Sequence, residues 1–231
     1  MAAQLIIIDP SVPQYDQLLA GISGEYDLLI LDQSQDGIQQ IAAYLQGKSG
    51  YEAIQVFSHG SSGTLYLGST VVNNSNLAEY HAQLQQIGSA LTDTGDILLY
   101  GCRVAEGEEG NRFVNSLADY TGVDIAASRD LTGNPALGGD WDLEVSTGEV
   151  DVNSFLSTDY SGVLTDGLTV SSNTKSGWNH TFGEWKNYGA FAVLKADGSV
   201  VAWGHNDYGG DSSTVATQLN GTDDILSAVV N

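Results

Sequence analysis

The sequence has few cationic residues, a single cysteine and no long apolar run, and each shortage excludes a class of protein. Only 7 Lys and Arg residues stand against 29 Asp and Glu residues, which gives a formal net charge of −22. A nucleic-acid partner is not expected, because neutralising phosphates requires clustered Lys and Arg. Hydrophobic residues still make up 42% of the chain, so they can build a core, and global disorder is excluded.

The one cysteine, Cys102, excludes an internal disulfide and any metal site built from several cysteines. The first residues lack a basic segment and their apolar run stops at Asp9, so we expect no Sec-type signal peptide. No apolar stretch approaches the ~18 residues needed to span a bilayer, so no membrane insertion is expected. Any export would use a route without an N-terminal signal peptide.

The N-terminal part of the chain alternates short apolar runs with helical patterns. Runs rich in Ile, Leu and Val predict buried strands at residues 4–8, 26–31, 53–57, 96–100 and 123–127. Between them, apolar residues at helical spacing predict helices at 15–22, 36–45, 76–91 and 111–120, the last ending at Gly122, which suits a C-cap. This alternation is typical of an α/β fold with a mostly parallel, doubly wound sheet covered on both faces.

The composition of the sequence changes from about residue 131. Residues 131–165 are rich in Gly, Asp, Ser and Thr, with a short strand candidate at 141–145, and we place them at the edge of the first domain. Further on, alternating stretches at 190–194 and 199–203 flank a turn containing Asp197 and Gly198, which predicts a hairpin. The sequence therefore predicts an α/β domain over residues 1–165 and an all-β segment over residues 166–231.

Two of the predicted strands are followed by residues that could carry chemistry. His59 and Gly60 follow one strand, and Gly101, Cys102 and Arg103 follow another. In an open parallel sheet, ligands bind outside the carboxyl ends of the strands. If the two strands are neighbours, the side chains of His59 and Cys102 come within hydrogen-bonding reach.

A histidine beside a cysteine suggests thiolate chemistry. An ordinary cysteine titrates near ~8.5, and an imidazole can activate it or protonate the leaving group. The backbone N–H groups of Gly60 and Cys102 would then stabilise an oxyanion. The alternative is that Cys102 is a small buried hydrophobe and that His59 is a surface or hydrogen-bonded residue.

Three charged residues are candidates for substrate binding. Asp9 and Asp32 each close a predicted strand at the same sheet edge, and they could line a pocket for a basic side chain or hold the histidine. The alternative is that each aspartate caps the next helix or turn. Arg103 is the third candidate, and no cofactor is expected. Calcium has no specific motif, because Ala43 stands where an EF-hand loop beginning at Asp32 requires a bidentate Glu.

The segment Ser-His-Gly after one strand and Cys-Arg after another resembles the caspase-like cysteine peptidases, which include caspases, metacaspases, legumains, gingipains and separases. The resemblance implies a caspase-like fold, Cys102 as nucleophile, His59 as general base or acid, and a protein or peptide substrate. Tyr100 and Gly101 stand where the caspase signature has Gln and Ala, and Val104 where it has Gly. Cleavage after aspartate is therefore not implied.

Residues 4–163 also resemble a bacterial domain family of unknown function, found at the N-terminus of long surface or secreted proteins with cadherin-like, calcium-binding or propeller repeats. The resemblance is carried by the segments IIIDPSVPQYDQLLAGI, IQVFSHGSSGTLYLG, ILLYGCRVAEGEEGNRFVNSLADYTGVDIAAS and GGDWDLE. It implies an extracellular or cell-surface location, with the cytoplasm as the alternative.

The C-terminal stretch AFAVLKADGSVVAWGHNDYGGDSSTVATQL is similar to one repeat of a β-propeller of the regulator-of-chromosome-condensation type. One repeat cannot close a propeller, so repeat domains of a longer parent protein are expected partners.

Two functions follow from these observations. One is a caspase-like cysteine peptidase or self-processing domain, at the N-terminus of a large bacterial surface or secreted protein. The other is a non-catalytic adhesion or interaction module of such a protein. The pairing of His59 and Cys102 favours the first, and the altered residues around Cys102 favour the second.

Overall fold

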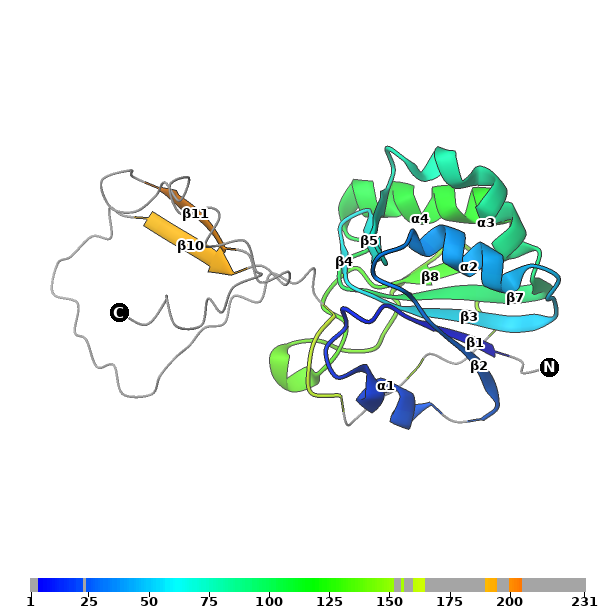
Figure 1. The fold of residues 1–231 in the computed structure, drawn as a ribbon, viewed down its shortest axis with the longest axis horizontal. Coiled ribbons are helices and arrows are strands. Elements are labelled where there is room, and N and C mark those ends of the chain that lie inside the picture. Colours follow the sequence, from blue (N-terminus) through cyan, green and yellow to red (C-terminus); the bar gives the residue numbers. More distant parts are fainter. Residues whose placement is uncertain are drawn as a thin grey trace, which may run out of the picture. The chain divides into compact units, whose positions relative to one another are not determined.

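The computed structural model describes residues 4–22, 24–151, 155 and 160–164, together with the backbone of residues 190–194 and 200–204. The chain divides into two compact units, Met1–Asp166 and Gly167–Asn231, and each is described by itself. The first unit is an α/β domain in which helices pack on a central sheet (Figure 1). None of the described helices is long and apolar enough to cross a membrane.

The central sheet has six strands in the order β2-β1-β3-β7-β8-β9. Five run parallel, and the short edge strand β9 (Val145–Ser146) runs antiparallel to β8. The parallel strands are β1 (Gln4–Ile8), β2 (Tyr26–Ile30), β3 (Tyr51–Phe57), β7 (Leu91–Tyr100) and β8 (Asp124–Ala127). The prediction of an α/β fold with a mainly parallel sheet is confirmed.

Alternate residues of the central strands face two separate cores, because successive side chains in a strand point to opposite faces. On one face, aliphatic side chains pack beneath α2 (Gly37–Leu45), α3 (His81–Gly88) and α4 (Gly107–Thr121); we call this the aliphatic cluster. The opposite face packs against α1 (Tyr15–Gly21) and the segments that follow β8. Its large rings are Phe57, Tyr100, Trp141, Phe155 and Tyr160, and we call it the aromatic cluster. Figure 1 shows α2, α3 and α4 on one side of the sheet and α1 on the other.

The ends of two helices follow from local sequence. Asp36 precedes α2, and its carboxylate accepts a hydrogen bond of 3.0 Å from the Gln39 N–H, as an N-cap does. α4 ends at Gly122, which has φ 75° and donates its N–H to the Ala118 carbonyl. The left-handed backbone there favours glycine, so the predicted C-cap is confirmed.

Other element boundaries differ from the sequence prediction. The predicted helix at 76–91 is a 3₁₀ turn, η1 (Leu77–Tyr80), followed by the shorter α3. The strand predicted at 141–145 is displaced to β9, because Trp141 is buried in the aromatic cluster. A second 3₁₀ turn, η2, spans Pro135–Leu137.

One small sheet was not predicted at all. Its strands are β4 (Gly60–Ser61), β5 (Thr64–Leu67) and β6 (Thr70–Asn73), and it follows directly after His59.

In the second unit the described backbone forms one antiparallel hairpin. β10 (Ala190–Leu194) pairs with β11 (Val200–Gly204), as the turn signal between them predicts. The rest of the predicted propeller-type repeat lies outside the described residues.

Candidate functional site

The strands that precede His59 and Cys102 are neighbours in the sheet. β3 and β7 pair in parallel, with Phe57 opposite Tyr100. His59 and Cys102 each stand two residues beyond this last pair. The segments beyond the strands are in close contact, because a β-carbon added to Gly60 would lie 3.0 Å from the Cys102 carbonyl oxygen. The structure therefore brings the two segments together, and the lack of a side chain at Gly60 permits this approach.

His59 is held with one ring nitrogen engaged and the other available. The residue is only 7% exposed, and its Nε2 lies 3.0 Å from the carbonyl oxygen of Ser11, in the loop after β1. Since a carbonyl oxygen only accepts hydrogen bonds, Nε2 carries the proton, and in the neutral ring Nδ1 keeps its lone pair. Nδ1 is buried and makes no hydrogen bond to any residue that the structure describes. His59 thus offers a proton acceptor inside the protein.

Asp9 fixes the loop that holds the histidine. It is buried, and one carboxylate oxygen accepts hydrogen bonds from the N–H and the hydroxyl of Ser11. The other oxygen accepts a hydrogen bond of 2.6 Å from the Gly68 N–H. Asp9 therefore reaches His59 through the Ser11 carbonyl, as a positioning residue. The carboxylate thus caps the turn that follows β1, which is the alternative that the sequence left open.

Cys102 belongs to the aromatic cluster and is 1% exposed. The Thr132 N–H donates a hydrogen bond to its Sγ at 3.2 Å, and the Thr132 carbonyl oxygen lies 3.6 Å from the same sulfur. Burial, and then the neighbouring Cys102 sulfur, raise the pKa of the Tyr160 hydroxyl to about 12. Tyr160 therefore stays protonated beside the thiol at neutral pH.

The two predicted oxyanion donors have different surroundings. The N–H of Cys102 already donates to a carbonyl oxygen, that of Leu164, at 3.1 Å. Gly60 stands at the start of β4, where it pairs with Leu65 of β5. The Cys102 amide thus faces an acyl group of the chain itself.

The other two predicted binding residues are exposed and make local contacts of their own. Asp32 is exposed, and its carboxylate accepts hydrogen bonds from Ser34 and Gln35; the backbone bond from Ser34 comes first among the causes that lower its pKa. Arg103 is also exposed and has φ 60°, which is uncommon for a residue with a side chain. Its N–H donates to the Asp130 carbonyl, so this backbone conformation fixes the turn directly after Cys102.

A group of carboxylates on the same edge could hold a cation. One oxygen from each of Asp130, Asp140 and Glu144 lies within 4.8 Å of the others. Burial, followed by the negative charges of Glu144 and Asp140, raises the pKa of Asp130 above its usual value of 3.8. Oxygen ligands of this kind suit calcium, but exposed acidic groups also gather in proteins without binding metal.

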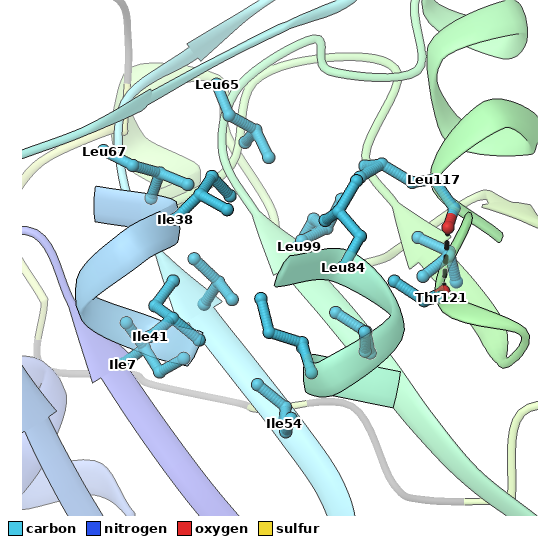
Figure 2. A pocket seen from close by; sticks show the side chains of 14 residues that line it. Ile7, Ile38, Ile41, Ile54, Leu65, Leu67, Leu84, Leu99, Leu117 and Thr121 are labelled. Atoms are coloured by element: carbon cyan, nitrogen blue, oxygen red, sulfur yellow. Dashed lines mark hydrogen bonds between the residues drawn. The ribbon is translucent and has the colours of Figure 1, made fainter. Parts of the chain in front are cut away.

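Two hollows of the domain are lined by neither His59 nor Cys102. One is a cavity of about 40 Å³ in the aliphatic cluster, with side chains from α2, α3, α4 and the central strands around it (Figure 2). Its polar lining residue, Thr121, donates its hydroxyl to the Leu117 carbonyl, so the cavity offers a ligand no anchoring group. The other is an open hollow of about 490 Å³ lined by Asp96 and Asp124. These two residues form the first pair between β7 and β8, at the end of the strands opposite to Cys102.

Sequence reasoning missed three residues of the site: Ser11, Thr132 and Leu164. Only Ser11 had a local signal, because Asp9 two positions earlier is typical of a turn in which the aspartate side chain accepts from the backbone. Thr132 and Leu164 stand in stretches without periodicity, and their contacts with Cys102 are long-range.

Comparison with known proteins gives a family but no activity. Two similar solved structures are a small-chain dehydrogenase (9% identity, 52% of this chain, 78% of that chain, TM-score 0.29) and a small-chain dehydrogenase in complex with NADPH (10%, 52%, 59%, TM-score 0.25). Similarities at these TM-scores support no argument about this chain. No curated protein matches it. Residues 5–164 match the family described as "Domain of unknown function (DUF4347)", so the chain belongs to that family.

Proposed function

We propose that the domain is a caspase-like cysteine peptidase or self-processing domain, with Cys102 as nucleophile and His59 as general base and acid. One observation carries this proposal: the Ser11 carbonyl fixes the protonated Nε2 of His59, which leaves Nδ1 as a buried proton acceptor on the segment after β3, next to the segment after β7 that contains Cys102. A ring held in this way needs no reorganisation before it accepts a proton.

The surroundings of Cys102 support acyl transfer. Its backbone N–H points at a carbonyl oxygen, which is the arrangement that stabilises the oxyanion of a tetrahedral intermediate. The Thr132 N–H donates a hydrogen bond to the sulfur and the thiol donates one to the Thr132 carbonyl oxygen, so both main-chain groups of Thr132 hold the nucleophile in place. The substrate class that fits a nucleophile, a base and an amide donor is a peptide bond or another acyl group.

A non-catalytic interaction module is the second candidate, and the burial of Cys102 favours it. A cysteine that is 1% exposed within an aromatic cluster also serves as a small core residue. The two candidates differ in one property, which is whether the reactivity of the thiol depends on His59.

The test measures alkylation of Cys102 by iodoacetamide from pH 5 to pH 9, with intact mass as the readout. Cys102 is the only cysteine, so every adduct reports on it. We expect native wild-type protein to react at a pH below the ordinary thiol midpoint of ~8.5, and His59→Gln to lose this low-pH reaction. Ser62→Ala, at an exposed hydroxyl beyond β4, is the matched control and should behave as wild type.

Because Cys102 is covered, the same pair is compared in a Gly133→Ala background. A β-carbon at residue 133 would lie 2.5 Å from the Gly162 carbonyl oxygen. This substitution therefore displaces residues 162–164, the segment that covers Cys102. A thiol that reacts with an ordinary pH midpoint and equal rates with and without His59, in both backgrounds, would refute the peptidase proposal in favour of the interaction module.

A further inference from the structure

Residues 162–164 cover Cys102 and pair with residues 132–134 through main-chain hydrogen bonds. The Leu164 N–H donates to the Thr132 carbonyl at 2.8 Å, and the Asn134 N–H donates to the Gly162 carbonyl at 2.8 Å. Between these bonds Gly133 pairs with Val163 in an antiparallel bridge. Extended peptides dock on proteins by this pattern of main-chain bonds, and here the docked peptide belongs to the chain itself.

This segment places one carbonyl oxygen on the backbone N–H of Cys102. The Leu164 carbonyl oxygen accepts the Cys102 N–H at 3.1 Å, and the Thr132 carbonyl that binds the Leu164 N–H also lies 3.6 Å from Cys102 Sγ. The amide and carbonyl of Leu164 are thus both held by groups that surround the thiol. A donor of this kind holds the oxygen where negative charge develops when a nucleophile attacks the carbonyl carbon.

The Leu164 side chain is itself packed in the core of the domain. It is fully buried and belongs to the aromatic cluster, together with Trp141 and Tyr160. Gly133, with φ 135°, makes this seat possible, because a β-carbon there would collide with the backbone of Gly162 and Val163. The chain therefore supplies main-chain hydrogen bonds, side-chain packing and an amide donor for a single residue.

From this geometry we propose that the domain cleaves its own chain at the peptide bond that follows Leu164, the Leu164–Thr165 bond. The proposal rests on the peptidase function proposed above and names its substrate. The bond stands next to the division between the two compact units, which falls after Asp166. Cleavage therefore separates the α/β unit from the unit that follows it.

The reaction needs only water as a second reactant. The Cys102 thiol gives its proton to His59 Nδ1, and the thiolate forms a bond to the Leu164 carbonyl carbon. The bond from that carbon to the Thr165 nitrogen breaks as His59 returns the proton to this nitrogen, which leaves a thioester. Water then attacks the thioester with His59 as base, and the thiolate leaves. The products are the Leu164 carboxylate and the Thr165 amine.

The experiment follows full-length protein by intact mass and N-terminal sequencing after purification and incubation at neutral pH. We expect fragments Met1–Leu164 and Thr165–Asn231, with a rate that does not change with protein concentration, because the bond is cut within one molecule. Cys102→Ala should stay intact, and His59→Gln should cleave at least about 10²-fold more slowly. Wild-type protein added to Cys102→Ala should leave it uncut.

Thr165→Pro is the variant that separates this proposal from the function it rests on. It replaces the secondary amide at the cleaved bond with a tertiary one and leaves the dyad untouched. We expect no cleavage, while the His59-dependent alkylation of Cys102 is kept. Wild-type protein that stays intact, or is cut at another bond, while alkylation still depends on His59 would overturn the self-cleavage proposal alone. Loss of the alkylation signature as well would overturn both proposals.

Discussion

The two faces of the central sheet are covered in different ways. The aliphatic cluster lies beneath three helices, α2, α3 and α4, whose apolar residues recur at helical spacing. The aromatic cluster is covered by α1 and by segments without regular structure that follow β8. The centres of both faces are equally shielded from solvent, because Ile6 and Ile7, on opposite faces of β1, are each fully buried.

The two faces therefore differ in what they contribute: one contributes mainly to stability, and the other holds the candidate reactive residue. The face beneath the three helices contains mainly aliphatic side chains and a small cavity whose polar lining residue, Thr121, already donates its hydroxyl to the Leu117 carbonyl. The other face contains Cys102 and the segment that carries Leu164. A segment held by a few main-chain bonds can leave and return at lower cost than a helix that buries a whole apolar stripe.

The largest effect is expected from truncation on the face beneath the helices. Phe113 of α4 is fully buried in the aliphatic cluster, so Phe113→Ala should lower the free energy of unfolding by about 3–5 kcal/mol. Urea unfolding measures this, with Asn115→Ala at an exposed position of α4 as the control. Cys102 packs in the cluster on the other face of the sheet, so its alkylation in the folded variant should keep its dependence on His59. A loss of that dependence would mean that the two faces are not independent.

A smaller and more local effect is expected on the face with Cys102. Gly133→Ala places a β-carbon against the Gly162 carbonyl, so it should cost about 1–3 kcal/mol and speed hydrogen exchange at the Leu164 and Cys102 amides. Gly138→Ala is the matched control, because Gly138 also has a positive φ but nothing within 4 Å of the added carbon. It should cost about 1 kcal/mol and leave both amides protected. Equal exchange in the two variants would contradict the close packing of residues 162–164 against Gly133.

The sequence predicted the regular part of the domain because burial leaves a periodic trace there. The run QLIII becomes β1, and Ile38, Ile41 and Leu45 form the buried stripe of α2. The start of α4 was misplaced because Gly107 and Gly110 weaken a helical signal. In the folded chain Gly110 packs so closely that a β-carbon would lie 2.4 Å from the Ala105 carbonyl carbon. Tertiary packing therefore outweighs helix propensity at this point.

The candidate site was only half predictable. His59 and Cys102 could be placed together because parallel strands bring their carboxyl ends to one edge of the sheet. Their partners could not, since the Ser11 carbonyl, the Thr132 amide and the Leu164 carbonyl are main-chain groups that every residue type carries. Only the folded path of the chain selects which of these groups meet the dyad, so residue identity alone leaves no trace of them.

The smallest effect is expected at the N-cap of α2, on the face beneath the helices. Burial raises the pKa of Asp36, but hydrogen bonds from the Gln39 N–H and the Tyr80 hydroxyl outweigh burial and hold that pKa below 3.8. A carboxylate with a lowered pKa stabilises the fold above its unfolded pKa and loses this contribution as pH falls through the folded value. Asp36→Asn keeps a good capping residue and removes the charge, so it should cost about 0.3–1 kcal/mol at pH 7. Thermal unfolding should show the gap between variant and wild type closing below pH 3.8, while Asp119→Asn at an exposed position of α4 shows no such gap. A gap that persists in acid would mean that Asp36 acts through its shape and not through its charge.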